Sequence, residues 1–203
     1  AELLLERQDE ILAVNREDCD ETLKAGLSQS LYKRLVLTER KISTIVESVR
    51  SVAALSDPVG QVIVRRELDS GLELQQVRVP IGVVGVIFES RPDALVQIAS
   101  LAVKSGNAAI LKGGSEAART NRLLHQLLVE ALVRENEAFG GALQLVETRE
   151  EIGTVLTLDR EIDLMIPRGS ADLVRYIQDN TRIPVLGHAD GVCHLYVDAG
   201  ADE

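Results

Sequence analysis

Hydrophobic residues in the first part of the chain, Ala1–Ser56, recur three or four positions apart with charged residues between them. This spacing predicts amphipathic helices, because residues three and four apart share one face of a helix. Thr38 stands where a helix N-cap belongs, within an apolar stripe that continues to Val52. The run Asp57-Pro58-Val59-Gly60 then ends the helical section, because proline and glycine favour turns.

The hydrophobic period changes to two after Gly60. Apolar residues alternate with polar ones in Gln61–Arg66 and again in Glu73–Val79, and Asp69-Ser70-Gly71 between them is a turn signal. We therefore expect a β-hairpin over about residues 61–79. Its mixed faces suit an arm that pairs with another chain as well as they suit a solvent-exposed ribbon.

From Pro80 onward, apolar segments typical of buried strands alternate with amphipathic helical segments. The predicted strands are Gly82–Phe88, Ala108–Leu111, Leu143–Val146, Asp163–Ile166 and His194–Val197. The predicted helices between them are Ala94–Lys104, Ser115–Glu135, Glu150–Leu156 and Ala171–Gln178. This alternation predicts an α/β fold, a doubly wound parallel sheet with helices on both faces.

The composition adds that the chain is acidic and able to form a large core. Its 203 residues suit one large domain or one and a half small ones, and a hydrophobic content of 45% argues against disorder. Acidic residues outnumber basic ones by 32 to 22, which gives a formal charge of −10. Nucleic acids and anionic membranes bind clustered Lys and Arg, so we expect neither as a partner.

Cysteine usage and hydropathy bear on the compartment. Cys19 and Cys193 lie too far apart in the sequence for a disulfide framework or a zinc motif, and so few cysteines suit a reducing cytoplasm. The apolar runs fall far short of the roughly 18 residues that a membrane span needs. Charges begin at Glu2, which is unlike a secretory signal. We therefore expect a cytoplasmic protein without a metal site.

Three strand-to-helix loops are candidates for chemistry, because ligands of open α/β sheets bind beyond the carboxyl ends of the strands. They are Glu89–Asp93, Lys112–Glu116 and Pro167–Ser170. Each places small residues or a cation where a helix begins, and free backbone N–H groups there can receive an anion. Gly113 and Gly114 would let a ligand approach the backbone.

Simpler interpretations of these loops remain open. Glycine and serine are ordinary helix caps, and a lone lysine is more often a solvated surface residue. The chain contains neither G-x-G-x-x-G after its first strand nor G-K-[ST], which argues against an ordinary Rossmann or P-loop site.

Cys193 lies between His188 and His194, a combination that suggests a nucleophile or a metal ligand. However, Cys193 opens an apolar segment, and buried cysteine is a common core residue. The set also lacks the ligand number of a zinc site. A structural role is therefore favoured for Cys193, and His125, among leucines, is interpreted as a helix-face residue.

Four separated motifs resemble those of one enzyme family in order and spacing. They are Val79–Asp93, Lys104–Asn107 with Leu111–Gly114, Ile166–Ser170 and Pro184–His194. On these motifs the chain resembles the gamma-glutamyl phosphate reductases, or glutamate-5-semialdehyde dehydrogenases, of the aldehyde dehydrogenase superfamily. The resemblance implies NADPH-dependent reduction of L-glutamate 5-phosphate to the semialdehyde and phosphate, the second step of proline biosynthesis, by a homodimer or homotetramer.

The resemblance also implies roles for the cofactor loops. Lys112 corresponds to a lysine that contacts the adenosine ribose, and Gly114 belongs to the same loop. Ser115 stands where NAD-using relatives often carry a glutamate, which favours NADP because a carboxylate would repel its 2′-phosphate. Gly169 and Ser170 correspond to the Gly-Ser that meets the cofactor pyrophosphate.

Near the reacting atoms, the resemblance implies that Ser90 is a candidate oxyanion donor, since a hydroxyl can hydrogen-bond a developing negative charge. Arg91, Arg168 and His188 are candidates for binding the substrate.

The nucleophilic cysteine of this family lies in a later segment, so the resemblance implies that Cys193 is not the nucleophile. We expect residues 1–203 to form the NADP-binding domain, including the helical segment 1–56 and the oligomerisation hairpin at about 61–79. Two alternatives remain: a non-catalytic nucleotide-binding or oligomerisation fragment, and the reductase part of a bifunctional pyrroline-5-carboxylate synthase, in which a glutamate kinase domain precedes the reductase.

Overall fold

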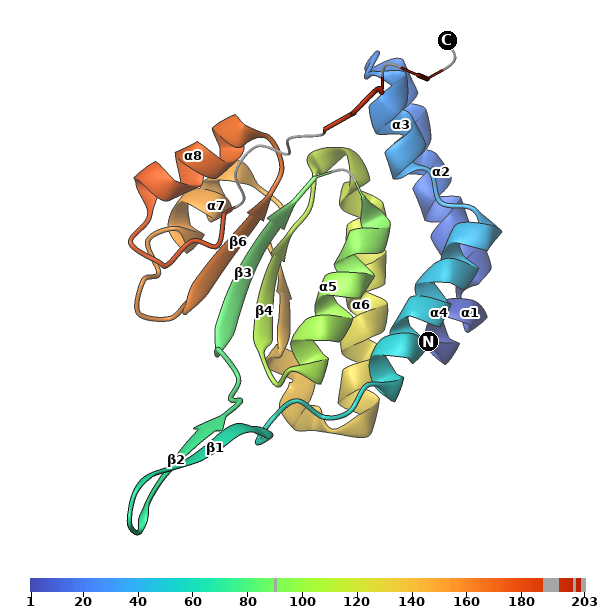
Figure 1. Cartoon of the computed structure of the whole chain (residues 1–203). Helices are drawn as coiled ribbons and strands as arrows, with labels where there is room; N and C mark the ends of the chain where they lie inside the picture. Colours follow the sequence, from blue (N-terminus) through green and yellow to red (C-terminus); the bar gives the residue numbers. More distant parts are fainter. Residues whose placement is uncertain (90, 188–193, 199, 202–203) are drawn as a thin grey trace.

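The fold is described from a computed structural model, which covers residues 1–89, 91–187, 194–198 and 200–201 (Figure 1). Ser90, His188 and Cys193 lie outside the described residues. Four parallel strands form a sheet in the order β5-β4-β3-β6, with helices on both faces, as predicted. The strands are β3 (Val83–Phe88), β4 (Ala108–Lys112), β5 (Leu143–Leu145) and β6 (Leu164–Arg168).

Eight α-helices are present in the described part of the chain, and their positions follow the predicted order. They are α1 (Glu2–Glu6), α2 (Gln8–Lys24), α3 (Gln29–Leu35), α4 (Glu39–Ala54), α5 (Pro92–Lys104), α6 (Ala118–Glu135), α7 (Arg149–Val155) and α8 (Ala171–Asn180). Two short 3-10 helices, η1 (Ser115–Ala117) and η2 (Glu137–Gly141), precede α6 and β5. The predicted N-cap is confirmed, since Lys41 N–H donates to the Thr38 hydroxyl at 3.2 Å.

Strand β3 is buried on both faces, which explains its uninterrupted apolar sequence. Val84, Val86 and Phe88 pack in the core formed with α5 and α6, whereas Ile87 packs in a second core. That second core includes Met165 of β6 and residues of α7 and α8. Successive side chains of a strand point to opposite faces, so the sheet separates two hydrophobic cores.

The N-terminal helices form a further layer outside α5 and α6 (Figure 1). Their buried apolar side chains, including Ile11, Ile42 and Ile45, join the same core as Leu95 and Leu124 of the inner helices. The predicted amphipathic pattern of residues 1–56 therefore reflects burial mainly against the helices α5 and α6.

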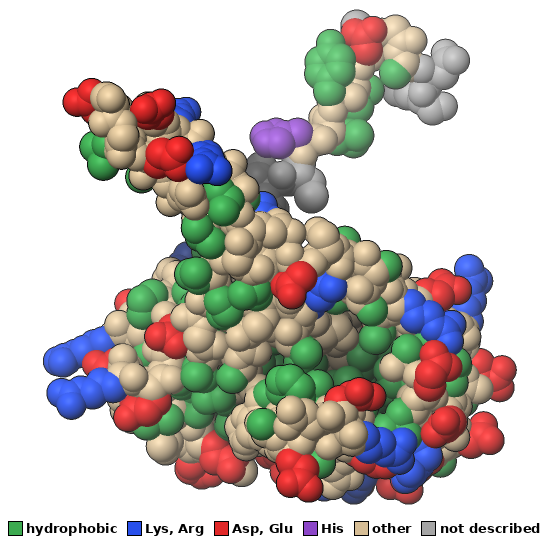
Figure 2. Space-filling model, turned by 90° about the horizontal axis from the view of Figure 1, so that it is seen from below, with side chains coloured by type: hydrophobic (Ala, Val, Ile, Leu, Met, Phe, Trp, Pro, Cys, Tyr) green, Lys and Arg blue, Asp and Glu red, His purple; other side chains and the backbone are tan. Residues whose placement is uncertain are grey.

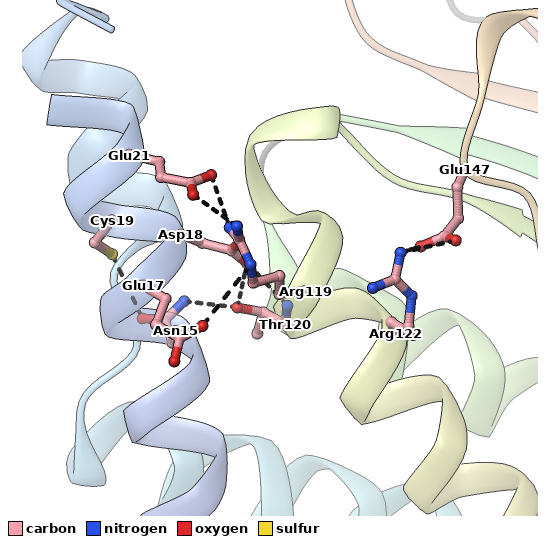
Figure 3. Close-up of polar contacts among 9 residues, drawn as sticks. All are labelled: Asn15, Glu17, Asp18, Cys19, Glu21, Arg119, Thr120, Arg122 and Glu147. Atoms are coloured by element: carbon pink, nitrogen blue, oxygen red, sulfur yellow. Dashed lines mark hydrogen bonds and ion pairs between the residues drawn. The ribbon is translucent and has the colours of Figure 1, made fainter. Parts of the chain in front are cut away.

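A buried carboxylate ties this outer layer to α6 (Figure 3). The N-cap of α6 is Ala117, which has no capping side chain. Asp18 of α2 takes that role, because its Oδ2 accepts hydrogen bonds from Thr120 N–H at 2.8 Å and from the Thr120 hydroxyl at 2.7 Å. Arg119 lies beside it, with Nη1 3.4 Å from Asp18 Oδ1. The side chain of Asp18 is only 3% exposed, so it satisfies the helix terminus in a dry environment.

Asn15 extends this buried network toward α3. Its Nδ2 donates to the Leu35 carbonyl at 3.1 Å, and its Oδ1 accepts from Leu37 N–H at 2.7 Å. The same Nδ2 lies 3.3 Å from the Thr120 hydroxyl. The turn between α3 and α4 is thus attached to the polar network that caps α6.

The predicted hairpin is confirmed as an antiparallel pair, β1 (Val62–Asp69) and β2 (Leu72–Val77). Gly71 has φ = 76°, a conformation that glycine adopts without strain, and it closes the turn. The hairpin projects from the body of the molecule (Figure 1), and nearly all of its residues are exposed.

The prediction of a last strand at His194–Val197 is wrong. Residues 194–198 form no strand, and the side chains of Leu195 and Tyr196 are 89% and 86% exposed. A strand needs a neighbour for its backbone hydrogen bonds, and nothing in the described parts of the chain pairs with this segment. The edge of β6 is instead joined by Val185, because Met165 N–H donates to the Pro184 carbonyl and Leu186 N–H donates to the Met165 carbonyl, both at 2.8 Å.

Acidic and basic side chains are mixed over the face seen in Figure 2, with hydrophobic ones between them. The basic side chains on this face do not form the continuous patch that nucleic-acid phosphates bind. None of the described helices combines the length and the hydrophobicity needed to cross a membrane.

The capping role of Asp18 predicts that Asp18→Ala lowers the free energy of unfolding by about 2–4 kcal/mol, because the Thr120 donors lose a buried acceptor. Urea denaturation followed by circular dichroism measures the change. Asp20→Ala is the matched control, since Asp20 lies on the same helix and is exposed. Equal stability of the two variants would contradict the capping role.

Candidate functional site

The three predicted loops leave one edge of the sheet. Ile87 in β3 is in register with Lys112 of β4 on one side and with Pro167 of β6 on the other. One residue further along, Phe88 is in register with Arg168. The loops after β3, β4 and β6 therefore begin at the same level, beyond the carboxyl ends of adjacent strands, where open α/β sheets bind ligands.

Lys112 lies on the sheet face that α7 and α8 cover. It borders the same small space as Ile87, Ile152 and Met165, and its Nζ donates to the Gly113 carbonyl at 2.5 Å. The first turn of α7 is close to it. Lys112 thus places a positive charge at the end of β4, next to the space between the sheet and α7.

A capping box fixes the start of α7 next to this cation. The Glu151 carboxylate accepts from the N–H groups of Thr148 and Glu147, at 2.7 and 2.9 Å, and Glu151 N–H donates to the Thr148 hydroxyl. These hydrogen bonds, with a smaller contribution from the charge of Lys112, hold the pKa of Glu151 below its usual value. The carboxylate therefore stays ionised and keeps the helix start in place.

Gly113 makes room for side chains of the protein itself. A Cβ there would lie 2.2 Å from Nδ2 of Asn121 and 3.1 Å from the Phe88 ring. Asn121 of α6 is 3% exposed, and its Oδ1 is a buried acceptor that has no hydrogen-bond partner within the described residues. At Gly114, the carboxylate of Glu116 occupies the space that a Cβ would need. Neither Asn121 nor Glu116 was singled out by the sequence, because neither residue type is informative without its neighbours.

Gly169 and Ser170 form the start of α8. The Ser170 hydroxyl caps the helix by accepting from Leu173 N–H at 3.4 Å. Ser170 N–H donates to Glu89 Oε1 at 3.1 Å, so a carboxylate from the β3 loop lies at this helix terminus. A Cβ on Gly169 would meet Leu173 Cδ2 at 2.8 Å and Glu89 Oε1 at 3.0 Å, which explains the glycine.

A groove of about 670 Å³ lies on the other face of the sheet, between α5 and strands β3 and β6. Its wall is mostly apolar, with Val86 and Ile166 among the lining residues, and it holds Glu89, Arg91 and Arg168 at the carboxyl edge. Arg91 also forms an ion pair with Asp93 at 3.0 Å. The structure therefore brings the two predicted substrate-binding arginines into one groove, with Lys112 on the opposite face.

A second cavity, of about 530 Å³, opens beside Ser115 at the start of η1. Arg119 and Arg122 of α6 line it together with Asp18, Glu21 and Glu116. Arg119 is strongly paired, since Glu21 and Asp18 raise its pKa (Figure 3). Arg122 forms an ion pair with Glu147 at 2.8 Å, next to the capping box of α7 (Figure 3).

The sequence model of the aldehyde dehydrogenase family matches residues 2–202, which is nearly the whole chain. The chain belongs to the aldehyde dehydrogenase family. It is 55% identical over 202 residues to the gamma-glutamyl phosphate reductase of Synechococcus sp. strain WH7803, covering 100% of this chain and 46% of that protein. It is also 52% identical over 202 residues to the gamma-glutamyl phosphate reductase of Acetivibrio thermocellus, a match that covers 100% of this chain and 47% of that protein.

Solved structures agree with this membership. The gamma-glutamyl phosphate reductase of Thermotoga maritima is similar with a TM-score of 0.89 and 38% identity, covering 99% of this chain and 49% of that chain. The gamma-glutamyl phosphate reductase of Saccharomyces cerevisiae is similar with a TM-score of 0.85 and 45% identity, covering 94% of this chain and 49% of that chain. These findings confirm the resemblance and the α/β fold. The chain spans about half the length of the relatives that it matches.

Membership in the aldehyde dehydrogenase family implies a nicotinamide cofactor, and the described residues fit one. The Glu89 carboxylate accepts from Ser170 N–H, so a negative charge lies at this helix terminus, as expected where free N–H groups gather. Lys112 supplies a cation at the neighbouring strand end. Within the described residues, no group of three or more His, Cys, Asp and Glu side chains could hold a metal ion.

The close approach at Gly113 predicts that Gly113→Ala lowers the free energy of unfolding by about 1–3 kcal/mol, because the new methyl group overpacks a buried site. Thermal denaturation measures the change. In an Asn121→Ala background much of this cost should disappear, since the side chain that the methyl group meets is gone. Gly153→Ala on α7 is the control, because its Cβ meets open space. A loss in Gly153→Ala as large as in Gly113→Ala would refute the packing argument.

Proposed function

We propose that residues 1–203 form the cofactor-binding domain of a gamma-glutamyl phosphate reductase. This enzyme reduces L-glutamate 5-phosphate with NADPH to L-glutamate 5-semialdehyde and phosphate, in proline biosynthesis. The observation that carries the proposal is identity of 55% over the whole chain to a reductase of that name, together with the gathering of the matching loops at one sheet edge. A cytoplasmic location suits such an enzyme, because its chemistry needs a free thiol.

The cofactor loops have separate tasks in this proposal. Lys112 binds the ribose of the cofactor, beside Gly114, and Gly169 with Ser170 binds the pyrophosphate through the N-terminal N–H groups of α8. When bound, NADPH supplies the hydride for the reduction. The residues of this chain hold it along the carboxyl edge of the sheet, where Gly169 also borders the groove on the α5 face.

The groove on the α5 face is the proposed substrate side. L-glutamate 5-phosphate is anionic at both ends, and Arg91 and Arg168 supply two cations at the carboxyl edge of this groove. Ser90, the candidate oxyanion donor, and His188, a further substrate candidate, stay part of the proposal and lie outside the described residues.

The reaction needs a thiolate that displaces phosphate from the substrate and forms a thioester. Cys19 is unsuitable, because it is 5% exposed and burial raises the pKa of its thiol. We therefore assign the nucleophile to a segment outside residues 1–203, as the resemblance implies. By itself the chain is expected to bind NADPH without turnover.

The exposed hairpin is the proposed oligomerisation arm. It carries exposed apolar side chains on both strands, among them Ile63, Leu68 and Leu74, and its outer backbone edges are available for pairing. We expect a homodimer or a homotetramer. Equilibrium sedimentation that shows only monomer would contradict this expectation.

The proposed ribose contact predicts that Lys112→Ala weakens NADPH binding about tenfold, the cost of one lost charge-assisted hydrogen bond. The measurement is fluorescence titration of NADPH with a protein of the relatives' full length that contains this chain. Lys104→Ala is the control, because Lys104 lies at the opposite end of α5 and donates to the Ala53 carbonyl. Failure of the unmodified protein to bind NADPH would overturn the proposal.

The reaction itself is tested in reverse on the same full-length protein. L-glutamate 5-semialdehyde, NADP⁺ and phosphate should yield NADPH, and omission of phosphate should abolish its formation. NADPH formation that does not depend on phosphate would indicate an ordinary aldehyde dehydrogenase reaction instead.

The proposed preference for NADP depends on Ser115, which shares a cavity with Arg119 and Arg122. Ser115→Glu should weaken NADPH binding about tenfold and leave NADH binding nearly unchanged, because the new carboxylate repels the 2′-phosphate. Ser115→Ala removes the hydroxyl without adding charge and should have a smaller effect. Equal losses for both cofactors in Ser115→Glu would refute the assignment.

A further inference from the structure

Glu89 lies where the cofactor pyrophosphate is proposed to bind. Its Oε1 accepts from Ser170 N–H at 3.1 Å, and the same oxygen lies 3.0 Å from the position of a Cβ on Gly169. Glu89 follows β3 directly, whereas Ser170 begins α8, so the contact joins two loops far apart in sequence. A carboxylate and a pyrophosphate both seek the N–H groups of a helix N-terminus.

The two anions cannot both use Ser170 N–H without strong repulsion, because like charges at hydrogen-bonding distances are unfavourable. We propose that Glu89 is an internal competitor of the cofactor: its carboxylate accepts from the N–H of the N-cap residue of α8 in the free protein and leaves Ser170 when the pyrophosphate binds. This inference rests on the proposed binding of NADPH. It makes Glu89 a residue that weakens cofactor binding, in contrast to Lys112, which strengthens it.

The structure offers cations for the displaced carboxylate. Arg34 of α3 lies with Nη1 3.9 Å from Glu89 Oε2, an ion pair that needs no contact with Ser170. Arg91 and Arg168 line the groove that Glu89 also borders. Because Arg34 already pairs with Glu89 while Oε1 accepts from Ser170 N–H, and can approach more closely once that bond is lost, Arg34 should favour cofactor binding only through Glu89.

The test compares Glu89→Gln and Glu89→Ala in the full-length protein, by titration with NADPH and with inorganic pyrophosphate. Both variants should bind each ligand about three- to tenfold more tightly, the effect expected for one charge at a helix terminus. Binding of adenosine, which carries no phosphate, should not change. Glu89→Gln keeps the shape and an acceptor oxygen, so the test does not depend on the stability of the alanine variant.

Two further variants separate competition from a general charge effect. Asp172→Asn removes an exposed carboxylate from the first turn of the same helix, and it should tighten binding less than Glu89→Gln does. Arg34→Ala should weaken NADPH binding in the unmodified protein and have no effect when combined with Glu89→Gln.

Weaker or unchanged NADPH binding in Glu89→Gln, while the unmodified protein binds NADPH, would overturn the inference and show that Glu89 is a structural clamp. An effect of Asp172→Asn as large as that of Glu89→Gln would overturn it too, as would an effect of Arg34→Ala that persists without the Glu89 charge. Absence of NADPH binding in the unmodified protein would instead count against the proposed function.

Discussion

The placement of the site depends on the capping of α6 by Asp18. This helix begins at the end of the loop that carries Lys112, and its own N-cap, Ala117, offers no acceptor. A helix terminus buried without partners is costly, so α6 needs an acceptor from elsewhere. Asp18 supplies it from the outer helical layer through Thr120. The N-terminal helices thereby fix the start of α6, which follows the loop of the proposed ribose site.

The alternation of side chains along the strands divides the chemistry between two faces. Lys112 is in register with Ile87 and lies on the side of α7 and α8, whereas Arg168 is in register with Phe88 and lies on the side of α5. A shift of one residue in register would exchange these faces. Strand geometry thus places Lys112 and Arg168 on opposite faces, and the carboxyl edge is the line along which the proposed cofactor and substrate would meet.

Several polar groups at this edge are already paired within the protein. Glu89 binds the start of α8, Glu151 binds the start of α7, and Glu147 binds Arg122. If the proposed anionic ligands bind here, a carboxylate near their phosphate groups either moves away or repels them, because like charges at short distance are unfavourable. The Glu151 carboxylate accepts from two backbone N–H groups, and Glu151 N–H donates to the Thr148 hydroxyl, so Glu151 has a structural role. Glu89 has one such bond and an ion pair with Arg34, which makes it the exchangeable one in this proposal.

The sequence by itself determined the order and type of the elements, since hydrophobic period and turn residues are local properties that each segment carries alone. It also placed the three loops at one sheet edge, because parallel strands with helical crossovers leave no other arrangement. Tertiary structure decided the rest: the capping of α6 by Asp18, the packing of Gly113 on Asn121, and the contact between Glu89 and Ser170. The absence of a strand at His194–Val197, despite its strand pattern, belongs with these features. Each of these features depends on a partner far away in the sequence, and the local pattern contains no information on whether that partner is in reach.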